Sequence, residues 1–472
     1  MTTIPPTRLA GLLGTWRPGG PAGDRLAATM RALVLDGRLP LHARLPPERA
    51  LAAALGLSRA TVTAAYDRLR ADGYVVSRQG AGSWVAMPAE SRAEGDELHD
   101  FDGLDLRIAA LPAPAAVGEL ALGAARELTG WLDHHGYNAL GLPPLRAAIA
   151  ARFSARGLPT APEQVLVTSG ALQALDLAIR ALLPRGRTAL VEIPSYPVAL
   201  DALRAAGARL VTVPVDEQGW DLDALEATAA SERPPLAYLM PDYQNPTGRL
   251  MDETARRRAL RALRRAGTIA VIDETFAELR LDGSEPTAPA AAWGGDATIV
   301  IGGLSKSVWG GLRVGWARGE PQTLRRLAAA RATSDMASPV LDQLLAVRVL
   351  EGLDGLLAER LPLLRARRAT LAQALALKLP AWRCAQPQGG MFLWVQLPEP
   401  ISTSLSVLAA ERGLALTPGP RFGAAGLLER RLRLPFTLAP EQLLRAVSLL
   451  AELAPLASGR GRAPDARLQY VA

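Results

Sequence analysis

From Pro162 onward, short apolar runs of strand length alternate with stretches of helical periodicity, and this alternation strongly constrains the fold of the 472-residue chain. The candidate strands span residues 165–168, 189–193, 210–213, 237–240, 269–272 and 298–301. Helical stretches lie between them, among them residues 171–183, 198–206 and 252–266. Such alternation predicts an α/β domain with a mostly parallel sheet.

Polar residues follow the ends of several candidate strands. They are Ser169-Gly170, Pro194-Ser195-Tyr196, the segment from Asp242 to Gly248, Asp273, and Ser305-Lys306. In parallel sheets, ligands bind at the carboxyl ends of the strands. We therefore expect these residues to converge on one crevice.

Lys306 is informative because lysine is very rare in this chain. Of its 53 basic residues, only Lys306 and Lys378 are not arginine. Arginine matches lysine in charge and in phosphate binding, but only a desolvated lysine loses its proton and reacts as an amine. Lys306 is thus a Schiff-base candidate, although a surface lysine left by chance is the simpler alternative.

The polar residues at the strand ends match the needs of one cofactor, pyridoxal 5'-phosphate (PLP). PLP needs an amine for its aldehyde, a carboxylate facing its pyridine nitrogen, a donor to its phenolate oxygen, and phosphate ligands. The candidates, in that order, are Lys306, Asp273, Asn245 and Arg313. Tyr196 would stack on the ring, and Ser169, Gly170 and Ala171 would hold the phosphate at the start of a helix.

Each of these residues alone has an ordinary explanation, since Asp273 fits a helix cap and Asn245-Pro-Thr-Gly a turn. Together and in this order they resemble class I aminotransferases of fold type I, over roughly residues 105–456. The resemblance implies that Arg433 takes a substrate or effector carboxylate. It also implies that Tyr137 reaches the phosphate of a neighbouring subunit, although the spacing here is one residue short.

Two positions depart from the aminotransferase pattern. The tyrosine that usually follows the pyridinium aspartate by three residues is Phe276, which cannot donate a hydrogen bond to the phenolate. The serine or threonine usually found three residues before the lysine is Gly303. Cofactor binding survives both changes in this interpretation, whereas efficient transamination is in doubt.

The first ninety residues predict a separate head that binds DNA. Asp24 is expected to cap a helix that ends near Gly37, a second helix follows Pro47 and ends at Gly56, and Ser58 caps a third. Two short strands joined by Gln79-Gly-Ala-Gly then read as a hairpin. Residues 1–86 hold eleven arginines against five acids, while the whole chain carries +7. A solvated amphipathic bundle is the simpler alternative.

The motifs of this head resemble the winged-helix domain of the GntR family. They are Leu45-Pro-Pro-Glu-Arg-Ala-Leu-Ala, Ser58-Arg-Ala-Thr-Val and Arg78-Gln-Gly-Ala-Gly-Ser. The resemblance implies contacts with double-stranded operator DNA from five residues, which are Arg49, Arg59, Thr61, Arg78 and Gly80.

The expected organisation is multidomain. An N-terminal tail (1–22) precedes a winged helix-turn-helix (23–86) and a linker (87–107). The PLP-binding α/β domain of transferase fold type I, with a smaller α+β C-terminal subdomain, occupies 108–456, and a disordered tail ends the chain (457–472). The single cysteine and four histidines give no ligand spacing, so we expect no metal, and the absence of a long apolar run favours a cytoplasmic protein without a membrane segment.

A winged helix followed by an aminotransferase-like domain resembles the MocR branch of GntR regulators. The resemblance implies a homodimeric, PLP-dependent transcriptional regulator that senses a small amino compound or PLP itself. The alternative is a working aminotransferase with an accessory DNA-binding head. Whether transamination persists is left open by Phe276 and Gly303.

Overall fold

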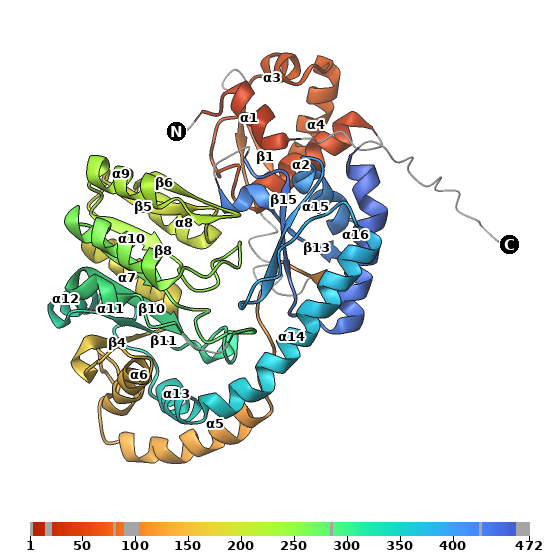
Figure 1. The fold of residues 1–472 in the computed structure, drawn as a ribbon. Coiled ribbons are helices and arrows are strands. Elements are labelled where there is room, and N and C mark those ends of the chain that lie inside the picture. The colour runs from red at the N-terminus through yellow and green to blue at the C-terminus, as the bar shows by residue number, and fades with distance from the viewer. Residues whose placement is uncertain are drawn as a thin grey trace. The chain divides into compact units, whose positions relative to one another are not determined.

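The computed structural model describes residues 3–14, 21–78, 82–88, 103–283, 287–423 and 427–458. These residues form two compact units, drawn in Figure 1. The first unit is assigned residues 1–108, 369–385 and 394–472, and the second residues 109–368 and 386–393. The first unit therefore combines the N-terminal head with the C-terminal part of the chain.

The head has the predicted helix-turn-helix and hairpin. Its elements are α1 (Pro6–Leu13), α2 (Ala22–Leu35), α3 (Glu48–Leu55), α4 (Arg59–Ala71), β1 (Val75–Arg78) and β2 (Gly82–Val85). Gly56 ends α3 in the left-handed conformation, and Ser58 caps α4 by accepting a hydrogen bond from the Thr61 amide. The two strands pair antiparallel, as a wing requires.

Two features of the head differ from the sequence expectations. Asp24 does not cap α2, because the helix begins at Ala22, after Pro21, and Asp24 is its third residue. Part of the expected N-terminal tail forms α1, whose Leu9, Leu12 and Leu13 are buried in the core of the head. Amphipathic spacing over only eight residues is a weak signal, which is why the sequence analysis missed α1.

The C-terminal part of the first unit contains a small sheet and its helices. The sheet has the order β12 (Phe392–Gln396), β15 (Arg431–Pro435), β14 (Thr417–Pro418). The helices are α15 (Ser402–Ala410) and α16 (Pro440–Ala457), and α14 (Leu353–Lys378) enters this unit from the second. Strand β3 (Leu104–Asp105) pairs in parallel with β13 (Leu414–Ala415), so the end of the expected linker is held by the C-terminal region. Most of that linker, residues 89–102, and the expected tail after Ser458 lie outside the described residues.

The second unit is built on an eight-stranded sheet. Its strand order is β4-β11-β10-β9-β8-β5-β6-β7. The strands are β4 (Val165–Thr168), β5 (Thr188–Ile193), β6 (Arg209–Asp216), β7 (Gly219–Trp220), β8 (Leu236–Leu239), β9 (Ile269–Asp273), β10 (Thr298–Gly303) and β11 (Gly315–Arg318). Only β7 and β11 run against the others, so the expected mostly parallel α/β sheet is confirmed.

Helices cover this sheet and complete the second unit. They are α5 (Ala116–Glu127), α6 (Pro143–Ala155), α7 (Ala171–Leu182), α8 (Pro197–Ala205), α9 (Leu222–Glu232), α10 (Glu253–Arg265), α11 (Ala291–Gly294), α12 (Pro321–Arg331) and α13 (Val340–Glu351). Helices α9 and α10 bury Leu225, Leu260 and Leu263 against apolar side chains of β5, β8 and β9. Within the part of the chain that the structure describes, no helix is long and apolar enough to cross a membrane.

Candidate functional site

The carboxyl ends of neighbouring strands in the second unit bring Lys306 and Asp273 into one site. Strand β10 lies parallel to β9 with Ile301 beside Asp273, and Lys306 follows three residues after the end of β10. The Lys306 ammonium donates a hydrogen bond of 2.9 Å to the Ala109 carbonyl, and its charge acts on the Asp273 carboxylate. The structure thus places Lys306 and Asp273, two of the residues expected to bind the cofactor, at the same edge of the sheet.

Asp273 is a buried carboxylate with several donors. Its side chain accepts hydrogen bonds from the Tyr238 hydroxyl at 2.7 Å, from the Thr275 amide at 2.9 Å and from the Thr275 hydroxyl. Burial raises the pKa of Asp273, whereas these hydrogen bonds and the Lys306 charge oppose that rise. The carboxylate is therefore held in one orientation at the end of β9.

The Arg313 side chain lies beside the start of α7. Arg313 has a left-handed backbone (φ 46°), and its guanidinium donates to the Ser169 carbonyl at 2.9 Å. Gly170 has φ 113°, and a Cβ placed on it would lie 3.2 Å from the Arg313 Nη2 atom. Only glycine leaves this approach open. The amides at the N-terminus of α7 and the arginine fork suit a phosphate.

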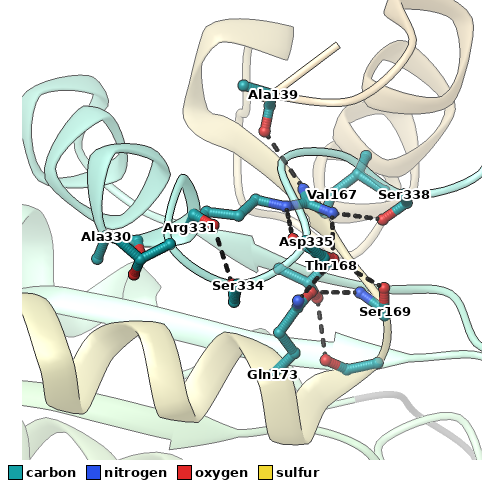
Figure 2. A network of polar contacts seen from close by, with 12 residues as sticks. Ala139, Val167, Thr168, Ser169, Gln173, Ala330, Arg331, Ser334, Asp335 and Ser338 are labelled. Carbon is teal, nitrogen blue, oxygen red and sulfur yellow. Dashed lines mark hydrogen bonds and ion pairs between the residues drawn. The ribbon is translucent and has the colours of Figure 1, made fainter. Parts of the chain in front are cut away.

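A network of hydrogen bonds holds the loop that carries Ser169 (Figure 2). The Asp335 carboxylate accepts from the Gln173 amide at 2.7 Å and from the Ser169 hydroxyl at 3.3 Å. Arg331, fully buried, donates to both Asp335 oxygens at 2.6 and 3.0 Å and to the Val167 carbonyl at 2.7 Å. The loop before α7 is therefore tied to the end of α12.

Asn245 lies in a buried turn that a second network holds. The neighbouring Gln244 donates to the Glu192 carboxylate at 2.9 Å and to the Pro194 carbonyl at 2.6 Å. The Glu192 carboxylate also accepts from the Trp220 indole at 2.6 Å, and burial raises the pKa of Glu192 to about 8. Because Pro194 begins the loop that carries Tyr196, this network joins the loops of two candidate ligands.

Phe276 and Gly303, the two departures from the aminotransferase pattern, are both closely packed against their neighbours. Phe276 is buried and packs edge to face on Phe392, with 5.3 Å between the ring centroids. A Cβ placed on Gly303 would lie 3.0 Å from the Val314 carbonyl oxygen, so the close pairing of β10 with β11 leaves little room for a serine side chain.

Other expected site residues are more dispersed. Tyr196 is half-buried at the start of α8, and Tyr137 is 64% exposed. Arg433 lies on β15 of the first unit, buried over the Phe422 ring at 5.0 Å and donating to the Arg107 carbonyl. Their roles toward a ligand stay predictions.

Three of the expected DNA-contacting residues, all arginines, are exposed on the head. Arg49 and Arg78 are exposed, and the Arg59 side chain is 73% exposed. The Thr61 hydroxyl, half-buried, shares a hydrogen bond of 2.8 Å with Ser58 at the start of α4. Gly80 lies outside the described residues.

The sequence analysis missed the residues that hold the others in place. They are Tyr238, Thr275, Gln173, Arg331 and Asp335. Thr275 carries a readable signal, since a donor two residues after an aspartate is typical of an Asx turn. A tyrosine inside the apolar strand β8 is a weaker signal, and nothing local marks Arg331 as buried.

Comparison with known proteins identifies two families in this chain. Residues 112–450 match the family "Aminotransferase class I and II", and residues 22–85 match "Bacterial regulatory proteins, gntR family". The 2-aminoadipate transaminase of Thermus thermophilus is 38% identical over 319 residues, 66% of this chain and 79% of that protein. The probable rhizopine catabolism regulatory protein MocR of Rhizobium meliloti is 33% identical over 329 residues, 64% of this chain and 66% of that protein.

A solved structure shows the same fold as the C-terminal part of the chain. It is LysN, the alpha-aminoadipate aminotransferase of Thermus thermophilus, complexed with N-(5'-phosphopyridoxyl)-L-leucine. The TM-score is 0.70 at 35% identity, and the match covers 77% of this chain and 95% of that one.

Proposed function

Because this chain belongs to the class I and II aminotransferase family and carries a gntR-family domain ahead of it, we propose that it is a PLP-dependent transcriptional regulator responding to a small amino compound. The single observation that carries the proposal is the presence of a gntR-family head and an aminotransferase-family domain in one chain. The probable rhizopine catabolism regulatory protein MocR of Rhizobium meliloti matches 64% of this chain.

The residues of the second unit fit PLP. When bound, PLP supplies an aldehyde for an amine and a ring that withdraws electrons. Lys306 would hold the aldehyde, Asp273 the ring nitrogen and Asn245 the phenolate oxygen. The amides at the start of α7 and Arg313 would hold the phosphate, where the missing side chain of Gly170 leaves the approach open.

Arg433 would receive a carboxylate of the effector. Its planar guanidinium is held by the Phe422 ring and the Arg107 carbonyl, which reduces the rotamer freedom lost on binding. The related LysN structure holds a cofactor joined to leucine, an amino acid. An amino acid or similar amine with an anionic group is therefore the proposed effector class.

A homodimer completes the proposal. The exposed Tyr137 would be covered by a second copy, and two heads would match a two-part operator. The coupling would be a linkage, in which an effector binds the two conformations of the regulator with different affinities and so changes operator affinity.

A mobility-shift titration with the DNA upstream of the protein's own gene tests the regulator. Full-length protein is compared in four states: without PLP, with PLP, and each with added candidate amino acids. We expect specific binding that changes with amine in the PLP-loaded form. Binding that responds to PLP alone would assign PLP as the signal, and the absence of any specific shift would remove the proposal.

A working aminotransferase is the second candidate, favoured by the 38% identity to a transaminase. Multiple-turnover conversion of an amino acid and a 2-oxo acid would support it. Phe276 argues against efficient turnover, because its ring cannot donate to the phenolate oxygen.

A further inference from the structure

The hydroxyl groups nearest Asp273 form a donor set whose role neither the sequence motifs nor the comparisons assign. Tyr238 donates to one carboxylate oxygen at 2.7 Å. Thr275 donates to the other oxygen twice, through its amide at 2.9 Å and through its hydroxyl. Both oxygens of Asp273 are therefore engaged by the protein itself.

The parallel register of β8 and β9 explains how Tyr238 reaches this carboxylate. Tyr238 lies beside Val271, and Asp273 is two residues further along β9. Since side chains alternate along a strand, Val271 and Asp273 share one face of the sheet with Tyr238. The Tyr238 side chain is fully buried, and burial followed by the Asp273 charge raises its pKa, so the phenol remains a donor.

A buried carboxylate in this position faces a conflict. Low dielectric surroundings favour the neutral acid, whereas a positively charged ring nitrogen requires the anion. Hydrogen bonds to the charged form resolve the conflict, because they stabilise the anion and are lost or weakened when the acid takes a proton. Tyr238 and Thr275 supply such bonds from two different elements, β8 and the turn after β9.

We propose that Tyr238 is a positioning residue which, together with Thr275, keeps Asp273 ionised so that the ring nitrogen of bound PLP stays protonated. This inference rests on the proposed cofactor and deepens it. Phe276, by contrast, carries no hydroxyl group, and its ring packs on Phe392. The electronic state of the cofactor would thus be controlled from the nitrogen side of its ring by β8 and the Thr275 turn.

The proposal can be tested with full-length Tyr238→Phe loaded with PLP that carries ¹⁵N in its ring. The measured quantity is the ¹⁵N chemical shift of the ring nitrogen near neutral pH. Loss of one hydrogen bond to a carboxylate is expected to change its pKa by about one unit, which is roughly a tenfold change in the ratio of protonated to neutral ring nitrogen. We expect the shift to move toward that of a neutral pyridine.

Two further variants make the result specific. Thr275→Val removes the other hydroxyl donor to Asp273, so it should move the ring-nitrogen shift in the same direction. Tyr243→Phe removes a hydroxyl from another buried tyrosine of the same unit, which does not contribute to the donor set of Asp273, and should leave the shift unchanged. If Tyr238→Phe fails to fold, Thr275→Val decides alone.

The outcomes separate this inference from the proposed function. Wild-type protein that binds no PLP removes the proposed function, and this inference with it. Wild type and the folded variants that all bind PLP with the same ring-nitrogen shift overturn this inference alone. A shift toward neutral pyridine in Tyr238→Phe or Thr275→Val, absent in Tyr243→Phe, supports it.

Discussion

Arg331 of the second unit and Arg59 of the head differ in burial and in the number of their hydrogen-bond partners. Arg331 has no exposed side-chain surface and donates to Asp335, to Ser338 and to two backbone carbonyls. Arg59, at the start of α4, is 73% exposed and lies 3.6 Å from Glu48. Arg331 therefore holds the structure of the second unit together, whereas most of the Arg59 side chain is open to a partner.

The two settings also differ in how their charges combine. In the second unit, the fully buried Arg256 is paired with a carboxylate, since it meets both oxygens of Asp242, at 2.8 and 3.2 Å. Removing one partner would leave the other desolvated and unpaired. On the head, water and salt screen each exposed charge. The loss of one arginine should therefore weaken DNA binding by an amount that depends little on the other arginines.

The largest expected effect is on stability and comes from Arg331→Met. The variant removes the Arg331 donor from the Val167 carbonyl and from Asp335, which keeps Gln173 and Ser169 as donors. Because Asp335 is partly exposed, the loss of its charge partner is expected to cost about 3 kcal/mol of unfolding free energy, the lower end of the range for a buried pair. Urea unfolding measures the loss. The matched control Arg59→Met should change stability by no more than about 0.5 kcal/mol. Equal losses of stability in the two variants would contradict the structural role of the buried Arg331.

The buried Glu192 of the second unit should make the stability of the protein depend on pH. Burial raises its pKa from 4.5 to about 8, so between these values the folded chain keeps a proton that the unfolded chain has lost. Stability from this group is therefore complete at low pH and is lost as the pH rises, by up to about 1.4 kcal/mol per pH unit. In Glu192→Gln this part of the slope should vanish. Urea unfolding followed by tryptophan fluorescence, between about pH 5 and pH 8, measures both slopes, and identical slopes would contradict the assignment.

A smaller effect is expected from Arg59→Ala in operator binding. Loss of one phosphate contact should weaken binding by about 1–2 kcal/mol and reduce the salt slope by about one. Fluorescence anisotropy with labelled operator at several salt concentrations measures both. Arg68→Ala is the control, since nine residues along α4 place it on the opposite face of the helix. Equal losses in the two variants would show that α4 does not present the Arg59 face to DNA.

The strands and motif residues could be predicted from the sequence because they depend on local pattern. The runs at 165–168 and 298–301 are apolar and bounded by polar residues, and they became β4 and β10. Strand β11 was missed because four residues beginning with Gly315 and containing Arg318 show neither strong alternation nor a long apolar run. Its antiparallel place between β4 and β10 follows from the whole sheet.

The supporting side chains of the site could not be predicted, because tertiary register decides them. Tyr238 reaches Asp273 only through the pairing of β8 with β9, which the sequence does not reveal. Asp335 reaches Ser169 across 166 positions of the chain. By contrast, Lys306 could be singled out from composition alone, since it is one of only two lysines among 53 basic residues.

The visible absorption spectrum of purified protein mixed with PLP, wild type against Lys306→Ala, tests the central assignment most directly. We expect the yellow band of a lysine-bound cofactor in the wild type and its absence in the variant, because Lys378 is the only other lysine of the sequence. The same band in both proteins, or no band in either, would contradict it.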